Sequence, residues 1–355
     1  MLCLSLVTLS LGALALASPA KRAQALSVSL TGPTSVESID ELKLTATVKN
    51  TGAEEVKILK YGTVLDADTP TRSFVISKDG VAANFTGIKI SLDLQKVGDE
   101  AFVTIPAGQS YTVEHEVASL YDFESLGTGS YSIEPVTTFQ IWGNEGEPVS
   151  RAKAQIGAQP VSVLVKGDVS KRELKAKRAT VSCSNSSQRS FISSSYTEGK
   201  SLASIASSYV SSNGANSLYT SYFGSTPTST VINVLNRVAN ENSGSRTLNC
   251  NDPYSVCGNG VIAYTVTSTT NIYFCSIFYD EVTTSRLCSD TSVASRNIRG
   301  GTVLHEITHA TSGTDDIGYG CSYDQNLGRT SPSQAAINAD NYNCFATQVY
   351  ASTRC

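Results

Sequence analysis

The sequence predicts an α+β protein, in which a β-rich, sandwich-like first half precedes a mainly helical second half with a small sheet. Three observations carry this prediction. Residues 23–165 contain no cysteine and several short runs in which apolar and polar residues alternate. The second half has longer stretches with apolar residues three and four positions apart, and it holds every cysteine after Cys3. The chain of 355 residues is also too long for one average domain.

The first residues have the pattern of a signal peptide. A short apolar run ends in small residues, and the basic pair Lys21-Arg22 follows it. The run is too short to cross a bilayer comfortably, and no later stretch is apolar for long enough. We therefore expect a signal peptide over 1–18 and a secreted, extracellular product that does not span a membrane.

Composition restricts the class of protein. Hydrophobic residues make up 40% and charged residues 16%, which favours packed cores over disorder. The net charge of −4 gives no basic surface for nucleic acid. We expect a monomer whose partners are not nucleic acids.

The β-rich prediction for the first half depends on short runs of period two separated by turns. Apolar and polar residues alternate over 26–30, 42–48, 103–105 and 131–136, and Asn50-Thr-Gly, Asp79-Gly and Pro106-Ala-Gly lie between such runs as turns. Short strands at this spacing are typical of a β-sandwich.

In the second half, helical periodicity predicts helices over 200–209, 228–239 and 302–310, the last ending before Gly313. Ser331-Pro332 has the pattern of a helix start and predicts a final helix that continues through 349. Residues 261–266 and 271–279 are rich in β-branched and aromatic side chains, which predicts two strands.

A charged segment separates the two halves. Residues 166–178 are dense in charge and end in the basic pair Lys177 and Arg178, just before Ala179. Such a segment is typical of an exposed, cleavable linker. We expect processing after Arg178, which divides the chain into 19–178 and 179–355. The triplets that begin at Asn84 and Asn185 are glycosylation acceptors.

Cysteine usage agrees with secretion. Nine cysteines occur, and the eight after Cys3 form an even set within the second half. In an exported protein, this set predicts four disulfides, and counting alone leaves their pairing open. The cysteines lack Cys-x-x-Cys spacing, so a cysteine zinc site is not expected.

The segment His305-Glu306-Ile-Thr-His309 carries the main chemical signal. Residues four apart lie on one face of a helix, so both imidazoles can bind one metal ion. Glu306 follows the first ligand and can act as general base on the attacking water. The pattern predicts one catalytic zinc ion and hydrolysis of peptide bonds.

A catalytic zinc site needs a third protein ligand. The second half has no other histidine, so we expect a carboxylate. Asp315, Asp316 and Asp340 are the candidates, and composition and spacing do not choose among them.

The His-Glu-Ile-Thr-His segment is followed closely by Gly313-Thr-Asp-Asp-Ile-Gly-Tyr-Gly320. The two motifs together resemble the deuterolysin family of fungal zinc proteases, the aspzincins. The layout of leader, long propeptide, basic pair and about 177 residues ending in cysteine is similar as well. The resemblance implies a zincin-type protease domain over 179–355 and a propeptide over 19–178.

The resemblance also implies roles for single residues. Asp316 has the family's spacing to Tyr319 and is the expected third ligand, with Asp315 as the alternative. For Asp340, considered as a ligand in such proteins, we expect a role in orienting a histidine by a hydrogen bond. We assign Tyr319 a hydrogen bond to the oxyanion. The family order implies the pairs Cys183–Cys250, Cys257–Cys275 and Cys288–Cys355, which leaves Cys321 and Cys344 for a fourth.

The functional hypothesis is therefore a secreted zinc endopeptidase made as a zymogen, with its own propeptide and protein or peptide substrates as partners. The rival hypothesis is a secreted, disulfide-rich binding or effector protein with a non-catalytic zinc site. The intact motif favours the enzyme.

Overall fold

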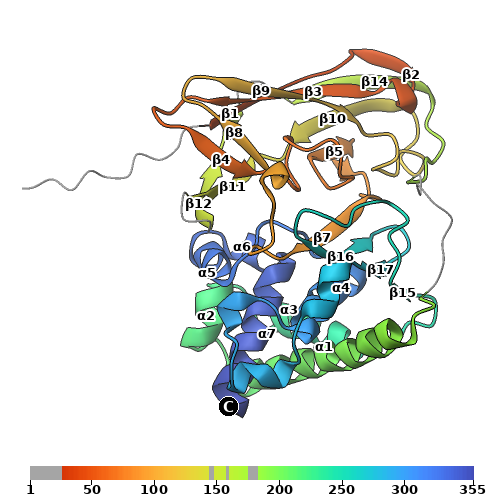
Figure 1. The fold of residues 1–355 in the computed structure, drawn as a ribbon. Helices are drawn as coiled ribbons and strands as arrows, with labels where there is room; N and C mark the ends of the chain where they lie inside the picture. Colours follow the sequence, from red (N-terminus) through yellow and green to blue (C-terminus); the bar gives the residue numbers. More distant parts are fainter. Residues whose placement is uncertain (1–25, 144–147, 157–159, 175–182) are drawn as a thin grey trace, which may run out of the picture.

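The computed structural model describes residues 26–143, 148–156, 160–174 and 183–355. Within these ranges the chain forms a β-rich part from the first half and a mainly helical part from the second, one above the other in Figure 1. The predicted α+β arrangement is confirmed at this level. The expected signal peptide and the basic pair Lys177-Arg178 lie outside the described residues.

In the described part of the first half, the chain forms fourteen strands. They are β1 (Leu26–Thr31), β2 (Ser35–Ser38), β3 (Lys43–Asn50), β4 (Val56–Leu59), β5 (Phe74–Lys78), β6 (Val81–Ala82), β7 (Ile88–Leu92), β8 (Phe102–Ile105), β9 (Ser110–Glu116), β10 (Gly129–Pro135), β11 (Thr138–Trp142), β12 (Pro148–Lys153), β13 (Gln155–Ile156) and β14 (Val161–Asp168). Three sheets are formed within this half, in the orders β13-β1-β3-β9, β2-β14-β10-β5-β6 and β12-β11-β4-β8.

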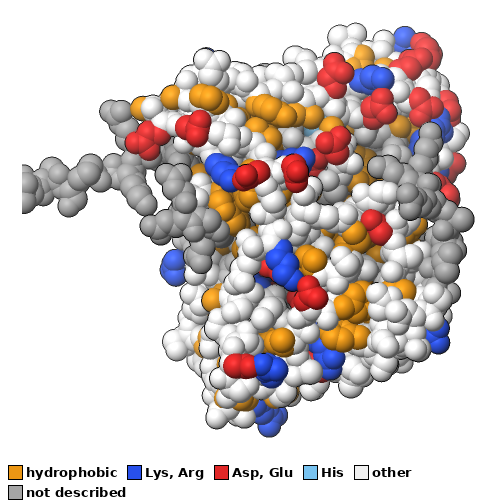
Figure 2. Space-filling model, viewed as in Figure 1, with side chains coloured by type: hydrophobic (Ala, Val, Ile, Leu, Met, Phe, Trp, Pro, Cys, Tyr) orange, Lys and Arg blue, Asp and Glu red, His pale blue; other side chains and the backbone are white. Residues whose placement is uncertain are grey.

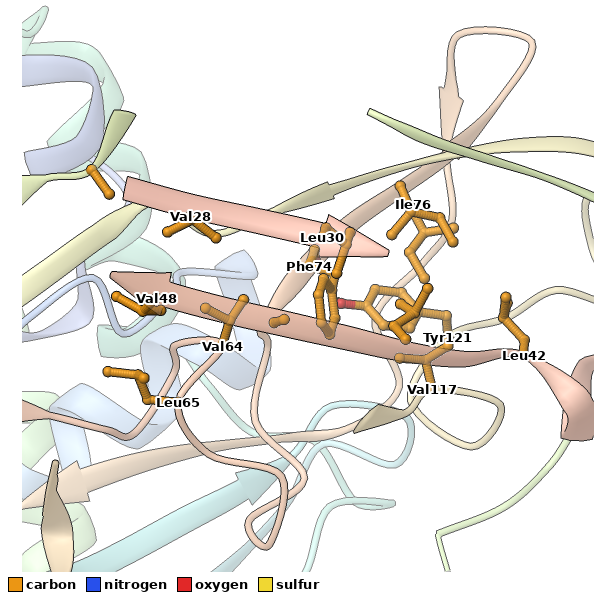
Figure 3. Packing of buried hydrophobic residues seen from close by; sticks show 14 of the residues in the cluster. Val28, Leu30, Leu42, Val48, Val64, Leu65, Phe74, Ile76, Val117 and Tyr121 are labelled. Atoms are coloured by element: carbon orange, nitrogen blue, oxygen red, sulfur yellow. The ribbon is translucent and has the colours of Figure 1, made fainter. Parts of the chain in front are cut away.

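One apolar core holds these sheets together. Alternate residues of β1 and β3 are buried, as period-two strands require. Val28 and Val48 of one sheet share a buried cluster with Ile76 of another and with Val64 and Phe74, several of them close together in Figure 3. Every member of this cluster comes from the first half. The predicted turn at Asp79-Gly80 connects β5 to β6, and both residues have positive φ.

The second half forms seven helices and three strands within the described residues. The helices are α1 (Ser186–Asn213), α2 (Ser217–Phe223), α3 (Thr228–Ala239), α4 (Arg299–Ser312), α5 (Cys321–Thr330), α6 (Pro332–Ala335) and α7 (Ala339–Arg354), and the strands are β15 (Leu248–Asn249), β16 (Val261–Val266) and β17 (Asn271–Phe274). A second buried cluster, drawn only from this half, fills the space among α1, α3, α4 and α7.

Three predicted elements differ from the structure. The helix expected over 200–209 is part of a longer helix, α1, which begins at Ser186 and ends at Asn213. The strand expected over 271–279 ends at Phe274, because the chain turns into a 3-10 helix at Ser276–Asp280. The final helix is broken into α6 and α7. The Asn338 side chain accepts a hydrogen bond from the Ile317 N–H at the break, and Asp315 pairs with Asn338 as an isolated bridge. These contacts stabilise the break. They involve residues outside the predicted helix, so the periodicity of the helix sequence does not indicate them.

A fourth sheet joins the two halves. Its order is β15-β17-β16-β7, so three strands come from the second half and the edge strand comes from the first. Strand β7 pairs antiparallel with β16, with Ile88 opposite Val266 and Ile90 opposite Tyr264. In Figure 1, β7 lies beside β16 at the boundary between the β-rich and helical parts.

Four disulfides cross-link the second half. They join Cys183 to Cys250, Cys257 to Cys275, Cys288 to Cys355 and Cys321 to Cys344. The first three are the pairs that the resemblance implies, and the fourth joins the two cysteines left over. The last bridge connects the first residue of α5 to α7.

The charged side chains on the surface reflect the nearly balanced numbers of acidic and basic residues in the sequence. On the face shown in Figure 2, acidic and basic side chains lie interspersed. Asn84 is exposed, and the side chain of Asn185 caps α1 by accepting from the N–H groups of Ser187 and Gln188. In the described residues, no helix has both the length and the apolar character needed to cross a bilayer.

Candidate metal centre

Helix α4 carries the His-Glu-x-x-His segment and is buried along most of its length. It packs against α1, α7 and the two neighbouring strands β16 and β7. A Cβ atom at Gly301 would lie 2.2 Å from Asn343 Oδ1, so glycine allows the close approach of α7. The helix ends as predicted, because Gly313 takes the left-handed conformation (φ 67°) and its N–H bonds to the carbonyl of His309.

Three side chains converge beside α4. His305 Nε2 lies 3.0 Å from Asp316 Oδ1, His309 Nε2 lies 3.1 Å from the same oxygen, and the two Nε2 atoms lie 3.1 Å apart. His305 and Asp316 are separated by 11 positions, and the turn after Gly313 brings the carboxylate back over the helix. The structure thus brings together the two histidines and the aspartate expected as third ligand.

These three atoms fit a zinc ion. A tetrahedral zinc with bonds of about 2.0–2.1 Å places neighbouring ligand atoms about 3.3 Å apart, close to the separations found here. His309 Nδ1 lies 2.8 Å from the carbonyl oxygen of Thr314 and donates to it, which leaves the Nε2 lone pair of the neutral ring for a metal. Burial works to raise the pKa of Asp316, but the two histidines outweigh it and hold that pKa well below its usual range.

Glu306 lies next to this group and is fully buried. Thr265 of β16 donates a hydrogen bond to Glu306 Oε2 at 2.6 Å, whereas Oε1 has no partner in the described residues. Burial raises the pKa of Glu306 to about 8. One oxygen is therefore fixed and the other is free to exchange a proton, as a general base requires.

The other two candidate carboxylates lie outside the three-atom group. Asp315 forms ion pairs with Lys89 at 2.9 Å and Arg72 at 3.2 Å, both from the first half. Asp340 Oδ1 lies 3.7 Å from Nδ1 of His305, the ring nitrogen that faces away from Asp316. That distance exceeds a hydrogen bond, so Asp340 acts on His305 mainly through its charge.

Asp340 is itself held by Arg296, which the sequence argument missed. Arg296 Nε lies 3.1 Å from Asp340 Oδ1, and the Gly320 N–H donates to Oδ2 at 2.7 Å. Burial works to raise the pKa of Asp340, but Arg296 and His305 outweigh it and hold the pKa at about 2. Neither Arg296 nor Thr265 belongs to a motif, and no local signal distinguishes either one.

Tyr319 lies at the end of the aspartate segment and is buried. Its hydroxyl donates to the carbonyl oxygen of Ile90 in β7 at 2.9 Å. The Gln140 side chain bonds to the backbone of Tyr319 twice. Its Nε2 donates to the Tyr319 carbonyl oxygen at 2.6 Å, and its Oε1 accepts from the Tyr319 N–H at 3.1 Å. The Tyr319 hydroxyl is therefore bonded to the backbone of β7, and its role as an oxyanion donor stays a prediction.

A second cluster meets metal-ligand spacing, but it does not fit an ion. Cys321, Asp324 and Cys344 lie within ligand distance of one another. The two cysteines are joined in a disulfide, which removes their thiolates. Within the described residues, the group at α4 is therefore the one that retains metal-binding atoms.

Comparisons with known proteins identify the family of this chain. A model of the family "Deuterolysin metalloprotease (M35)" matches residues 1–353. A peptidyl-Lys metalloendopeptidase of Armillaria mellea is 31% identical over 357 residues, covering 97% of this chain and 95% of that protein. A neutral protease 2 homolog of Aspergillus fumigatus is 34% identical over 330 residues, covering 87% of this chain and 84% of that protein.

Among solved structures, a zinc peptidase from Grifola frondosa is 26% identical, with a TM-score of 0.38. It covers 46% of this chain and 96% of its own chain. The residues that the family model matches include both motifs around the metal centre, and the two relatives cover 97% and 87% of the chain. The chain therefore belongs to the deuterolysin (M35) family and is a metalloendopeptidase.

Proposed function

We propose that the chain is the zymogen of a secreted, zinc-dependent endopeptidase. Residues 1–18 direct export, 19–178 form the propeptide, and 179–355 form the zincin-type protease, whose covalent link to the propeptide is cut after Arg178. The arrangement of His305, His309 and Asp316 around one point carries the proposal. The four disulfides of the second half suit an extracellular enzyme.

His305 Nε2, His309 Nε2 and Asp316 Oδ1 would hold one zinc ion. When bound, the ion supplies Lewis-acid chemistry that polarises the scissile carbonyl and makes water a better nucleophile. Glu306 Oε1 accepts the proton of the attacking water and delivers it to the leaving amine, while the Thr265 hydroxyl fixes Oε2. The Tyr319 hydroxyl donates to the carbonyl oxygen of the substrate as negative charge develops there.

Asp340 and Arg296 position the first ligand. The negative charge of Asp340 lies on the Nδ1 side of His305 and favours a proton at that nitrogen, which directs the Nε2 lone pair to the ion. Arg296 keeps Asp340 ionised in a fully buried environment. Neither residue touches the reacting atoms, so both are positioning residues.

The decisive experiment uses Glu306→Gln in the processed protein. We expect zinc content equal to wild type by metal analysis, with casein hydrolysis reduced by about 10²–10⁴-fold. Glu281→Gln is the matched control, because Glu281 is also buried with a pKa raised to about 8 by burial, yet contacts Thr302 and not the metal group. Retained activity in Glu306→Gln would refute the mechanism.

The zymogen part of the proposal is tested separately. Mass spectrometry of the secreted, active protein should find a mature chain that starts at Ala179. A chelator should abolish its casein hydrolysis, and added zinc should restore it. Active protein in which residues 26–174 remain covalently attached would contradict the zymogen model.

A further inference from the structure

Strand β7 belongs to the first half of the chain, but it packs against the second half as an extended peptide packs in a binding cleft. One of its edges pairs antiparallel with β16, from Leu92 opposite Val261 to Ile88 opposite Val266. In an extended chain, successive peptide groups face opposite edges. The N–H and C=O of Ile90 face away from β16, toward the segment that carries Asp316 and Tyr319.

The second edge of β7 bonds to the machinery of the metal centre. The Ile90 N–H donates to Asp316 Oδ2 at 2.8 Å, and the Ile90 carbonyl accepts from the Tyr319 hydroxyl at 2.9 Å. Two residues on, the Leu92 carbonyl accepts from Arg296 Nη1 at 2.8 Å. A ligand carboxylate, the proposed oxyanion donor and a positioning residue are therefore all bonded to one strand of the first half.

The side chains of β7 reinforce this position. Lys89 is opposite Thr265, the residue that bonds Glu306, so both lie on the sheet face against α4. Lys89 is 6% exposed; it forms an ion pair with Asp315 at 2.9 Å and donates to the carbonyl of Thr314. The charge of this buried lysine is thus satisfied entirely by the segment next to the metal ligand.

An apolar core shared by both halves surrounds these contacts. Its buried members from the first half are Leu59, Ile88, Ile90, Leu92 and Ala101, and those from the second half are Val261, Tyr264, Val266, Tyr273, Cys275 and Tyr319. Gln140 and Arg72 add polar contacts to Tyr319 and Asp315. None of these residues lies in the linker that ends at Arg178, so cutting the linker removes no contact among them.

We propose that the first half stays bound after the linker is cut and acts as a non-covalent inhibitor, with β7 filling the peptide-binding cleft between β16 and the Asp316–Tyr319 segment. The inference rests on the proposed function. Cleavage at Arg178 allows the two halves to dissociate. Dissociation of the first half then makes the metal centre accessible to substrate. An extended peptide substrate then takes the edge of β16 in place of β7.

The binding part is tested on the full chain carrying Glu306→Gln, which lacks turnover. An endoprotease specific for paired basic residues cuts the linker, and size exclusion and hydrogen exchange are measured before and after. We expect both fragments to elute together and the amides of β7 to keep their protection. Fragments that separate on cutting, or β7 amides that lose protection at once, would overturn the proposal. Neither readout depends on the proteolytic activity of this protein.

The inhibitory part is tested with Lys89→Met in the wild-type background. Removing one partner of a buried ion pair weakens an interface strongly. After the linker is cut, we expect peptidase activity at least about tenfold above that of cut wild type, with earlier separation of the fragments. Lys57→Met is the matched control, because Lys57 pairs with Asp99 inside the first half. It should behave as wild type.

Full activity of cut wild type with the first half still bound would contradict inhibition by β7, as would a Lys89→Met variant equal to wild type. The proposed function fails by a different result. A second half freed of the first half and supplied with zinc would then remain inactive, whatever the binding measurements give. The two failures are therefore distinguishable.

Discussion

The two halves of the chain are stabilised in different ways. Residues 19–178 contain no cysteine, and the described part of them depends on one apolar core drawn from its own side chains. The second half has its own core and four disulfides that tie its helices and loops together. The two meet at β7 and a smaller shared core. The difference teaches that covalent cross-links add to the stability of the second half, whereas the first half depends on packing alone.

Reduction of the disulfides should separate the stabilities of the two halves most strongly. The bridges close loops of 67, 18, 67 and 23 residues, and in the chain-entropy model each contributes about 3–4.5 kcal/mol. Their combined loss exceeds the stability of a typical domain. We expect a reductant to unfold the second half, seen as loss of helical circular dichroism.

The only tryptophan, Trp142, lies buried in β11 and reports on the first half alone. Its emission should remain that of a buried indole while the helices unfold. A shift of Trp142 emission in step with the helical signal would mean that the first half has no stability of its own.

A core substitution in the first half tests the comparison from the other side. Phe139 is fully buried in β11, within the first-half core. We expect Phe139→Ala to lower the free energy of unfolding of the first half by about 3–5 kcal/mol, because it leaves a cavity. Urea titration followed by Trp142 emission measures this loss.

Phe345→Ala is the matched variant, since Phe345 is fully buried in α7 within the second-half core. It should lower the stability of the second half by a similar amount and leave the Trp142 midpoint nearly unchanged. Equal shifts of both signals in both variants would show that the halves unfold as one cooperative unit.

The two halves are also expected to differ in the pH dependence of their stability. Burial raises the pKa of Glu281 from 4.5 to about 8, so between these values the folded second half binds more protons than the unfolded chain. Its stability falls as pH rises, by at most about 1.4 kcal/mol per pH unit. Burial lowers the pKa of His115 below 6.5, so the first half loses stability as pH falls below that value.

Thermal unfolding from pH 5 to pH 8, followed by Trp142 emission and by helical circular dichroism, compares the two halves. Glu281→Gln should remove the contribution of Glu281 to the change of stability with pH in the second half. His115→Gln should remove the contribution of His115 in the first half. Slopes unchanged in both variants would assign the pH dependence to other groups.

The site was partly predictable because its motifs are local. His305 and His309 share a helical face by spacing alone, and the structure puts them there. Asp316 follows within a short turn, so few residues separate it from its partners. Arg296 and Thr265 were not predictable, because each acts through one contact with a residue at least 41 positions away. The break between α6 and α7 depends on a contact of Asn338 with Ile317, which lies 21 positions away.

Strand β7 illustrates the same limit. Residues 88–92 alternate between aliphatic and polar side chains, which is typical of a half-buried strand, yet all five are buried. The polar Lys89 would be expected on a solvent face. Its burial depends on Asp315, which lies 226 positions later and supplies the opposite charge.

The sequence by itself determined the division into a β-rich and a helical half, the disulfide-bearing half and the two histidines with their glutamate. These features depend on composition, periodicity and spacing within a few turns of chain. Only the tertiary structure decided that a strand of the first half completes the sheet beside the metal centre. Backbone hydrogen bonding is the same for every sequence, so which strand pairs with β16 is selected by side chains that meet only after the chain has folded.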